Sequence, residues 1–583
     1  MTLARFIPFL AMAVVCVRAI ASETPQQQLK ALADHFVSEL LAYDPTISYF
    51  SGLQTTDHSR FADRSPSALA AWDARESAVL HALTAIDASV LPTSSRATYA
   101  VLKERLESDL QLRVCKTELW NVNHFDGWQT AFAEVAEQQP IGTAEARAQA
   151  LARWRSLPRY LEVEISNLRQ GLRQGYAAPK SVVLRVIAQM DGLIAAPSRE
   201  SPFYSPADRD GDPEFRTAFA QLIAGKINPA IQHYRDYLRH DYLPHAREGI
   251  AVSDLPDGKR CYQAFLRYNT TLNRTAQEVY DLGRATVEAN KADVIRIGSS
   301  LFGTTDYDSI ISKSRARPEN HFKSQDELLA YSRELLVKAK TRTATLVDRM
   351  PAQDVIIEPE RDFEDAAGVS SHYIPNPDIS KPGSYRIELG NWQTEQRAEA
   401  EVTVVHEAWP GHHLQIALAR EIGPDTSLAK LSYNSAYIEG WARYAEAMGE
   451  EAGIYPDEDA KILRRIWPAR GMVVDPGLHA FGWTRQQAID YLVSSGRFGA
   501  KAADDVVDRI AMLPGQYTSY DSGGLEIKAL RAEAQAALGA RFDLREFNRT
   551  VLEEGVVPLT ELRLHVKAWI SSKGVAGDGV GAG

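Results

Sequence analysis

Histidines and acids between residues 401 and 440 have the side chains of a catalytic zinc site. Residues 401–415 read EVTVVHEAWPGHHLQ, in which His406 and Glu407 are adjacent and His412 and His413 follow. In the usual zinc peptidase helix, two histidines at positions i and i+4 share one face and bind one tetrahedral ion, while a Glu between them serves as base. Position 410 is a proline here, so this regular pattern is absent.

The spacing of these histidines excludes chelation from a straight helix. His406 and His412 are six residues apart, about 240° around an ideal helix, and so point to different faces. His406 and His413 nearly share a face, but they lie about 10 Å apart along the axis. Pro410-Gly411 could change this, because proline disrupts the hydrogen-bond ladder and glycine permits unusual dihedrals. A local bulge could then bring His412 back toward His406, with His413 as the alternative.

A third ligand is expected from the downstream segment YNSAYIEGWARYAE. Ser435–Glu446 is helical in character, and Glu439 lies 27 residues beyond His412. A carboxylate on a second helix would complete a His₂Glu catalytic site and leave one position for water. The residues alone equally allow a simpler interpretation, in which Glu439 and Glu446 form a solvated helix face.

The composition limits the class of protein. The chain has 583 residues, 24% charged and 45% hydrophobic, which is typical of a soluble protein and excludes a disordered, collagen-like or polytopic membrane protein. The net charge of −11 without basic runs argues against nucleic acid as the main partner.

The N-terminus predicts export. Arg5, the apolar run 6–17 and Ala19-Ile20-Ala21 follow the order of a signal peptide covering residues 1–21, although a buried N-terminal helix is the alternative. Cys16 follows Val15 rather than a small residue, and no other segment reaches the length of a membrane helix, so we expect no stable membrane anchor and a periplasmic or secreted protein.

Two cysteines follow the predicted signal peptide. An oxidising compartment permits a disulfide between Cys115 and Cys261. The residues favour two buried free thiols instead, since nothing in the sequence places them together.

The remaining pattern is mainly helical. Strand signals are sparse and best at 354–359 and 384–389. We predict one continuous unit made of an N-terminal helical lobe at 22–270 and a catalytic lobe at 271–573, followed by a disordered tail at 574–583. Apolar spacing and breakers predict helices at 29–40, 144–156, 160–175, 214–240 and 274–298.

Several longer motifs carry a family resemblance. HEAWPGHHLQ, YIEGWARYAE, VVDPGLHAFGWTRQQAIDYL and LPGQYTSY, with DPTISYFSGL and NLRQGLRQGYAAPKSVV upstream, resemble the bacterial domain of unknown function 885 over nearly the whole mature chain. That family is similar to gluzincin metallopeptidases near thimet oligopeptidase, angiotensin-converting enzyme and the Taq-type carboxypeptidase. The resemblance implies a mainly α, two-lobed fold with a small β-sheet beside the metal helix and a deep central channel.

The resemblance also implies roles for individual residues. His406, His412 and Glu439 match the ligands of one zinc ion, with His413 as the rival for the second ligand, and Glu407 matches the general base. Related peptidases place Tyr or His where the oxyanion forms, so Tyr520 is the first candidate and His479 the second.

The chain departs from the family after Tyr520, where Asp521-Ser522-Gly523 replaces an expected Lys and apolar residue. An acid there could change which substrate end is tolerated. Tyr517 offers the same phenol three residues earlier.

Substrate contacts are expected on both sides of the metal motif. By analogy, residues 370–392 supply an edge strand for an extended peptide. Tyr373 and Tyr517 are the predicted substrate-binding residues, and His372 is a minor candidate. A bidentate carboxylate clamp could come from one of five basic residues, none of which we assign because most should form ion pairs: Arg470, Arg485, Arg509, Lys528 and Arg531.

Together these patterns predict an exported, zinc-dependent, peptidase-like hydrolase of small peptides, with Glu407 as base. One alternative is a zinc amide or ester hydrolase of a non-peptide metabolite. The other is a catalytically weak periplasmic binding protein with the same fold and metal.

Overall fold

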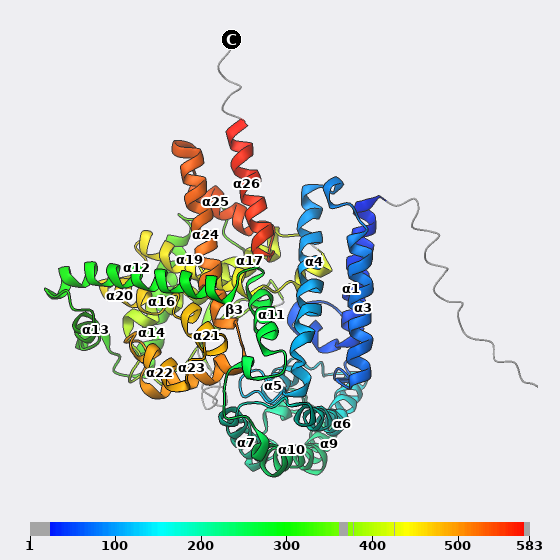
Figure 1. Cartoon of the computed structure of the whole chain (residues 1–583). Coiled ribbons are helices and arrows are strands. Elements are labelled where there is room, and N and C mark those ends of the chain that lie inside the picture. Colours follow the sequence, from blue (N-terminus) through cyan, green and yellow to red (C-terminus); the bar gives the residue numbers. More distant parts are fainter. Residues whose placement is uncertain (1–23, 361–370, 377, 425, 576–583) are drawn as a thin grey trace, which may run out of the picture.

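The computed structural model describes residues 24–360, 371–376, 378–424 and 426–575, and helices dominate it (Figure 1). This confirms the predicted mainly helical class. The predicted signal peptide lies outside the described residues. The last helix, α26, continues to Val575, so the predicted tail begins two residues too early; its remainder also lies outside the described residues.

Three long helices pack side by side at the N-terminal end (Figure 1). They are α1 (Pro25–Tyr43), α3 (Pro66–Thr84) and α4 (Thr93–Leu112). α1 begins in a capping box, in which the side chains of Thr24 and Gln27 bind each other's backbone N–H. Its apolar side chains recur every three or four residues and are buried against α3 and α4, which is why this helix was predictable.

A second group of helices follows, and it has its own hydrophobic core. The predicted helices at 144–156 and 160–175 are one helix, α6, which passes through Pro158 and ends at Gly175. Gly175 has φ 82°, a left-handed conformation that glycine adopts without strain, so the predicted stop is confirmed. The main helices here are α5 (Trp128–Gln138), α6 (Ala144–Gln174), α7 (Lys180–Ala195), α9 (Pro213–Leu222) and α10 (Asn228–Tyr237).

Helix α11 (Gly258–Thr270) packs between the N-terminal and the C-terminal helices. It contacts α4 on one side and α24 (Gln516–Leu538) on the other. Cys261 on α11 forms a disulfide with Cys115, which follows α4. The prediction of two free thiols is therefore wrong, because helix packing brings together residues that are 146 positions apart.

The C-terminal part contains the largest hydrophobic core, to which helices and the sheet both contribute. Three of its helices, α16, α17 and α19, carry the histidines and acids of the candidate site. Its helices are α12 (Ala276–Phe302), α13 (Tyr307–Arg315), α14 (Gln325–Thr343), α16 (Arg397–Glu407), α17 (His412–Ile422), α18 (Ser427–Leu431), α19 (Ser435–Glu451), α20 (Glu458–Ile466), α21 (Gly471–His479), α22 (Arg485–Val493), α23 (Ala500–Met512), α24, α25 (Leu544–Leu552) and α26 (Leu559–Val575).

A small sheet of three strands lies in this part, in the order β1-β3-β2. β1 (Val355–Pro359) pairs with β3 (Gly383–Ile387) in parallel, and β2 (His372–Ile374) pairs with β3 in antiparallel fashion. β3 alternates buried and half-buried residues, as expected for a strand with one face on the core. The two predicted strands are confirmed within a few residues, and β2 lies at a sheet edge within the segment expected to supply one.

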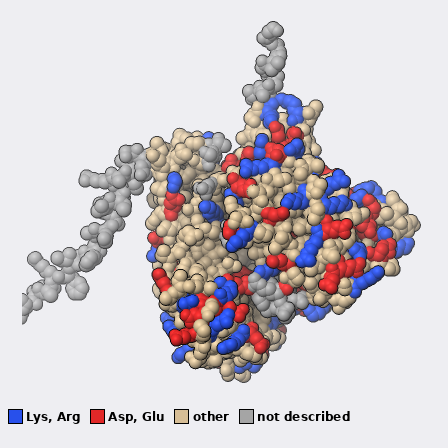
Figure 2. Space-filling model, turned by 180° about the vertical axis from the view of Figure 1, so that it is seen from behind, with Lys and Arg blue, Asp and Glu red and all other residues tan. Residues whose placement is uncertain are grey.

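Charges of both signs are interspersed over the face seen in Figure 2. Among the described residues, no helix combines the length and the apolar character that crossing a membrane requires.

Candidate metal centre

The metal motif is divided between two helices. α16 ends at Glu407 and α17 begins at His412, and Ala408 between them has a non-helical backbone with φ −112° and ψ −95°. The Trp409–Pro410 peptide bond is cis. The ring centroids of His406 and His412 are 4.7 Å apart, so the predicted break at Pro410-Gly411 is confirmed and does bring the two rings together.

Two contacts hold this break in place. A Cβ at Gly411 would lie 1.9 Å from the carbonyl oxygen of His406, so only glycine allows the chain to pass so close to the end of α16. The indole N–H of Trp441, on α19, donates to the carbonyl oxygen of Pro410 at 2.9 Å. The same helix that supports the break also carries the candidate third ligand.

Glu439 on α19 reaches both histidines. Its Oε2 is buried and lies 3.3 Å from Nε2 of His406 and 3.4 Å from Nε2 of His412, and no other polar group of the described chain pairs with it. The three ligand atoms lie within 4.8 Å of one another. Ligand atoms 2.0–2.2 Å from a tetrahedral zinc ion are separated by about 3.3–3.6 Å, and the two separations from Glu439 Oε2 to the histidines match this spacing.

A second carboxylate orients His406. Nδ1 of His406 lies 2.9 Å from Oε1 of Glu446, and Arg443 donates to the same oxygen at 2.7 Å. Burial lowers the pKa of His406, but the carboxylates of Glu439 and Glu446 outweigh burial and raise the pKa to about 10. Metal-binding histidines commonly donate their other N–H to a carboxylate, which fixes the ring and its tautomer.

Glu446 is the residue whose role the sequence analysis missed. The residue types alone allow a solvated helix face here, yet the Glu446 side chain is 2% exposed. It stands seven residues after Glu439, two helical turns on the same face, and that spacing is the signal that could have found it.

Glu407, the predicted base, is buried at the last position of α16, beside the first ligand. Burial raises the pKa of its carboxyl, and the imidazoles of His412 and His406 partly offset this. The charge of Glu407, after burial, also raises the pKa of Tyr385 on β3, so the acid faces the small sheet.

Tyr520 lies on α24, which packs closely along α19. Burial raises the pKa of its hydroxyl, and the charge of Glu439 adds to this. The guanidinium carbon of Arg443, which donates to Glu446, lies 5.6 Å from the Tyr520 ring centroid, so the phenol is near the cluster. The hydroxyl accepts a hydrogen bond from the Gln516 amide at 3.2 Å, which leaves its own proton to donate elsewhere. Tyr517 stacks on Tyr520 with ring centroids 6.0 Å apart, so both phenols of the motif share one wall.

The departure from the family pattern after Tyr520 has a packing reason. A Cβ at Gly523 would lie 1.7 Å from the carbonyl oxygen of Ala436, so glycine is what lets α24 approach α19. Asp521 is buried, with its Oδ1 3.8 Å from Nε of Arg443. The acid therefore faces the arginine that supports Glu446, and a role in choosing the substrate end does not follow from its position.

His413 lies apart from the cluster. Tyr373 on β2 donates its hydroxyl proton to Nδ1 of His413 at 3.0 Å, and Nε2 donates to the carbonyl oxygen of Gln353 at 3.0 Å. Burial lowers the pKa of His413 to about 4. Both nitrogens are thus occupied, which favours His412 as the second ligand. The Tyr373 hydroxyl holds α17 against the sheet, so only its ring is left for a substrate.

His479, the second oxyanion candidate, is a structural residue. Its Nδ1 accepts the backbone N–H of Val252 at 3.0 Å, and its Nε2 lies 3.0 Å from the carbonyl oxygen of Ile510, to which it donates. Burial lowers its pKa to about 3. No ring N–H is left for an oxyanion, so the prediction of that role is wrong. No local pattern could show this, since Val252 is 227 residues away.

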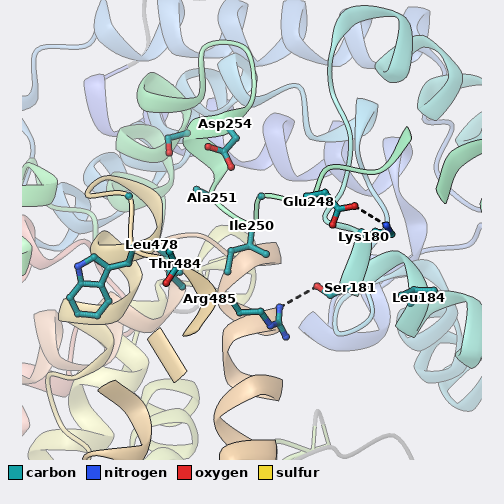
Figure 3. A pocket seen from close by; sticks show the side chains of 14 residues that line it. Lys180, Ser181, Leu184, Glu248, Ile250, Ala251, Asp254, Leu478, Thr484 and Arg485 are labelled. Carbon is teal, nitrogen blue, oxygen red and sulfur yellow. Dashed lines mark hydrogen bonds and ion pairs between the residues drawn. The ribbon is translucent and has the colours of Figure 1, made fainter. Parts of the chain in front are cut away.

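A cavity of about 520 Å³ lies elsewhere, between α7 and the start of α22 (Figure 3). Its charged groups have partners: Lys180 pairs with Glu248 at 2.7 Å, Arg485 with Asp508 at 2.6 Å, and Asp254 lies 4.0 Å from Arg247. None of the candidate ligands lines it.

Comparison with known proteins agrees with this fold. The chain is similar to the crystal structure of a presumed lipoprotein from Colwellia psychrerythraea, with a TM-score of 0.87 and 22% identity over 94% of this chain and 100% of the other. It is also similar to a presumed lipoprotein of unknown function from Shewanella oneidensis, with a TM-score of 0.74 and 18% identity over 92% and 99%. No curated protein matches the chain.

The family model described as "Bacterial protein of unknown function (DUF885)" matches residues 45–566. The match covers most of the chain and includes every candidate site residue. The chain therefore belongs to the DUF885 family.

Proposed function

We propose that this protein is a zinc-dependent hydrolase that cleaves peptide or amide bonds in small substrates. The observation that carries the proposal is the position of Glu439 Oε2. It lies 3.3 and 3.4 Å from the Nε2 atoms of His406 and His412, and no other polar group of the described residues pairs with it. A metal ion bound by all three side chains would satisfy this buried carboxylate and both ring nitrogens at once.

Zinc held by His406, His412 and Glu439 would supply Lewis acidity, which lowers the pKa of water and polarises a carbonyl. Glu407 accepts one proton from the attacking water and passes it to the leaving nitrogen as the C–N bond breaks. Tyr520 donates a hydrogen bond to the oxygen on which negative charge develops. The products are a carboxylate and an amine.

The wider setting belongs to the same proposal. We infer kinship with the gluzincin peptidases and a two-lobed fold whose central channel admits short chains and excludes folded proteins. We also infer action after export, in the periplasm or outside the cell. The N-terminal pattern of residues 1–21, the presumed lipoproteins of similar fold and the disulfide between Cys115 and Cys261 support export.

The test combines metal content with turnover. We expect the chain from Ser22 to bind about one zinc ion and to cleave members of a mixed peptide library, followed by mass spectrometry, in a chelator-sensitive way. Glu407→Gln should keep its zinc and lose about 10²–10⁴-fold in rate. Glu288→Gln, the same change at an exposed position of α12, is the control and should keep full activity.

Three outcomes would contradict the proposal. A protein that binds no zinc lacks the centre, and full activity in Glu407→Gln excludes this residue as base. Zinc without peptide cleavage would favour hydrolysis of a non-peptide amide or ester, or a binding role.

A further inference from the structure

The structure separates the basic residues that could bind a substrate carboxylate. Arg470 is buried and donates to the carbonyl oxygens of Ile466 and Tyr491. Arg485 and Arg531 each have a carboxylate partner within 3 Å. Three of the five candidates thus have structural partners.

Lys528 is exposed on the surface of α24. Arg509 differs from the other four basic residues in its surroundings. No Asp or Glu in the described part of the chain lies within ion-pair distance of Arg509, whose Nε is buried without a hydrogen-bond partner. Its Nη2 makes a long contact, 3.5 Å, to the side-chain oxygen of Gln516, and the Tyr520 hydroxyl is another polar neighbour.

Aromatic rings hold the Arg509 guanidinium in place. The guanidinium carbon lies 4.1 Å from the ring centroid of Phe125 and 5.0 Å from that of Tyr517. Phe125 belongs to the N-terminal part of the chain, whereas Arg509 is in the last turn of α23. The nearby acid is Asp126, whose pKa burial raises and Arg509 lowers. The cation therefore sits where the two ends of the chain meet, with neutral neighbours on two sides.

Arg509 also lies on the side of the metal cluster where Tyr520 stands. Gln516 bridges the two residues, since its amide oxygen is 3.5 Å from Arg509 and its amide nitrogen 3.2 Å from the Tyr520 hydroxyl. Glu439, Tyr517 and Tyr520 are among the groups that raise the pKa of Arg509 against burial. The structure thus places Glu439, Tyr520 and Arg509 in sequence across α19, α24 and α23.

We propose that Arg509 binds the free α-carboxylate of a short peptide or peptide-like substrate, so that the hydrolysed bond lies near the carboxyl end. A guanidinium presents a planar fork that matches a carboxylate, and contact with aromatic rings leaves its N–H donors unused for such a pair. Among the described residues no carboxylate lies within ion-pair distance of this partly buried cation, so an anion that the substrate supplies would stabilise it. The proposal rests on the proposed hydrolase function and specifies its substrate class.

The experiment compares one neutral tripeptide as the free acid, the same tripeptide as the C-terminal amide, and an amide with Glu at the last position. Zinc-loaded wild type should prefer the free acid by about 10- to 100-fold in kcat/KM. Arg509→Gln should bring the acid down to the amide level, mainly through KM, and Arg509→Lys should keep part of the preference. Arg531→Gln removes an arginine already paired with Glu451, and it should keep the full preference.

A binding measurement separates this proposal from the proposed function. In Glu407→Gln protein, calorimetry should show the free acid binding at least about 10-fold more tightly than the amide, and adding Arg509→Gln should abolish the difference. This difference in affinity can be measured even if no peptide is hydrolysed. Absence of hydrolysis would contradict the proposed hydrolase function but not the role of Arg509 in binding. Zinc content and melting temperature confirm that each variant is folded. If Arg509→Gln does not fold, Arg509→Lys replaces it in the comparison.

Three results would overturn the role of Arg509. The first is equal use and equal binding of acid and amide by wild type. The second is an acid preference that survives in folded Arg509→Gln. The third is a preference for the Glu-bearing amide over the free acid, since it would identify a side-chain carboxylate as the group that is bound.

Discussion

The junction of α16, α17 and α19 and the junction of α21 with α23 both bury histidines at helix ends, yet the two regions use them differently. At the first, His406 and His412 direct their Nε2 atoms at one oxygen of Glu439 that has no other partner in the described chain. At the second, both nitrogens of His479 bind backbone groups, from Val252 and Ile510. Burial is common to both, so the partner of each nitrogen is what distinguishes the candidate metal ligands from a structural histidine.

His413 sharpens the comparison because it is adjacent to His412 in sequence and resembles His479 in its contacts. Tyr373 and the Gln353 carbonyl satisfy its nitrogens, and burial lowers its pKa to about 4, as burial lowers that of His479 to about 3. In His406 the neighbouring carboxylates raise the pKa instead. Substitutions beside His406 and His412 should therefore affect zinc binding, whereas a substitution of His479 should affect only stability.

The largest effect is expected for Gly411→Ala, which acts on the first region alone. The new Cβ would lie 1.9 Å from the His406 carbonyl oxygen, so α16 and α17 must move apart. A displacement of about 1 Å at a catalytic site can lower turnover by 10²-fold, and we expect at least that loss together with reduced zinc content. Gly192→Ala, in α7 where a Cβ meets no atom within 4 Å, is the control. Unchanged turnover in Gly411→Ala would show that the break does not set the ligand geometry.

A smaller effect is expected for Glu446→Gln. The variant keeps the size of the side chain but removes the charge that orients His406, so zinc affinity should fall about 10- to 100-fold. Competition with a chelator of known affinity measures the change. Glu450→Gln is the matched control, because Glu450 lies on the same helix and pairs with Arg464 and Arg465 but with no histidine. Equal effects of both substitutions would remove the proposed positioning role of Glu446.

The sequence predicted those parts of the fold that depend on local pattern. The spacing of apolar residues predicted α1 and α12, and the glycine at position 175 predicted the end of α6. The proximity of His406 and His412 could also be predicted, because Pro410-Gly411 is a local signal for a helix break. The sequence did not show whether α6 is one helix or two, because the packing of its apolar face on the surrounding helices outweighs the local effect of Pro158.

Residues whose roles depend on distant partners could not be predicted. Cys115 and Cys261 meet only through α4 and α11, and His479 is defined by Val252, which is 227 residues away. Arg485 is paired with Asp508, whereas no described carboxylate lies within ion-pair distance of Arg509, and the sequence around either residue does not reveal this difference. Pairing across the fold, rather than residue type, decided these cases.

The smallest effect is expected for His479→Gln, and it appears in stability rather than in zinc content. Glutamine can accept from Val252 and donate to Ile510, but it does not titrate. Burial lowers the folded pKa of His479 to about 3, below the value of about 6.5 in an unfolded chain. The unfolded state therefore binds more protons between these values, so this contribution to stability is complete above pH 6.5 and is lost as the pH falls.

Denaturant unfolding of wild type and His479→Gln at pH 7.5 and pH 5 measures this pH-dependent contribution to the free energy of unfolding. Wild type should lose about 2 kcal/mol more than the variant over this interval, because 1.5 pH units below the unfolded pKa correspond to that free energy. Other buried histidines, such as His413, are present in both proteins and cancel. His479→Ala should also lose stability at pH 7.5, since it leaves the Val252 N–H and the Ile510 carbonyl without partners, while its zinc content stays near one per chain. Loss of zinc from either variant would place His479 with His406 and His412, and the distinction between the two regions would fail.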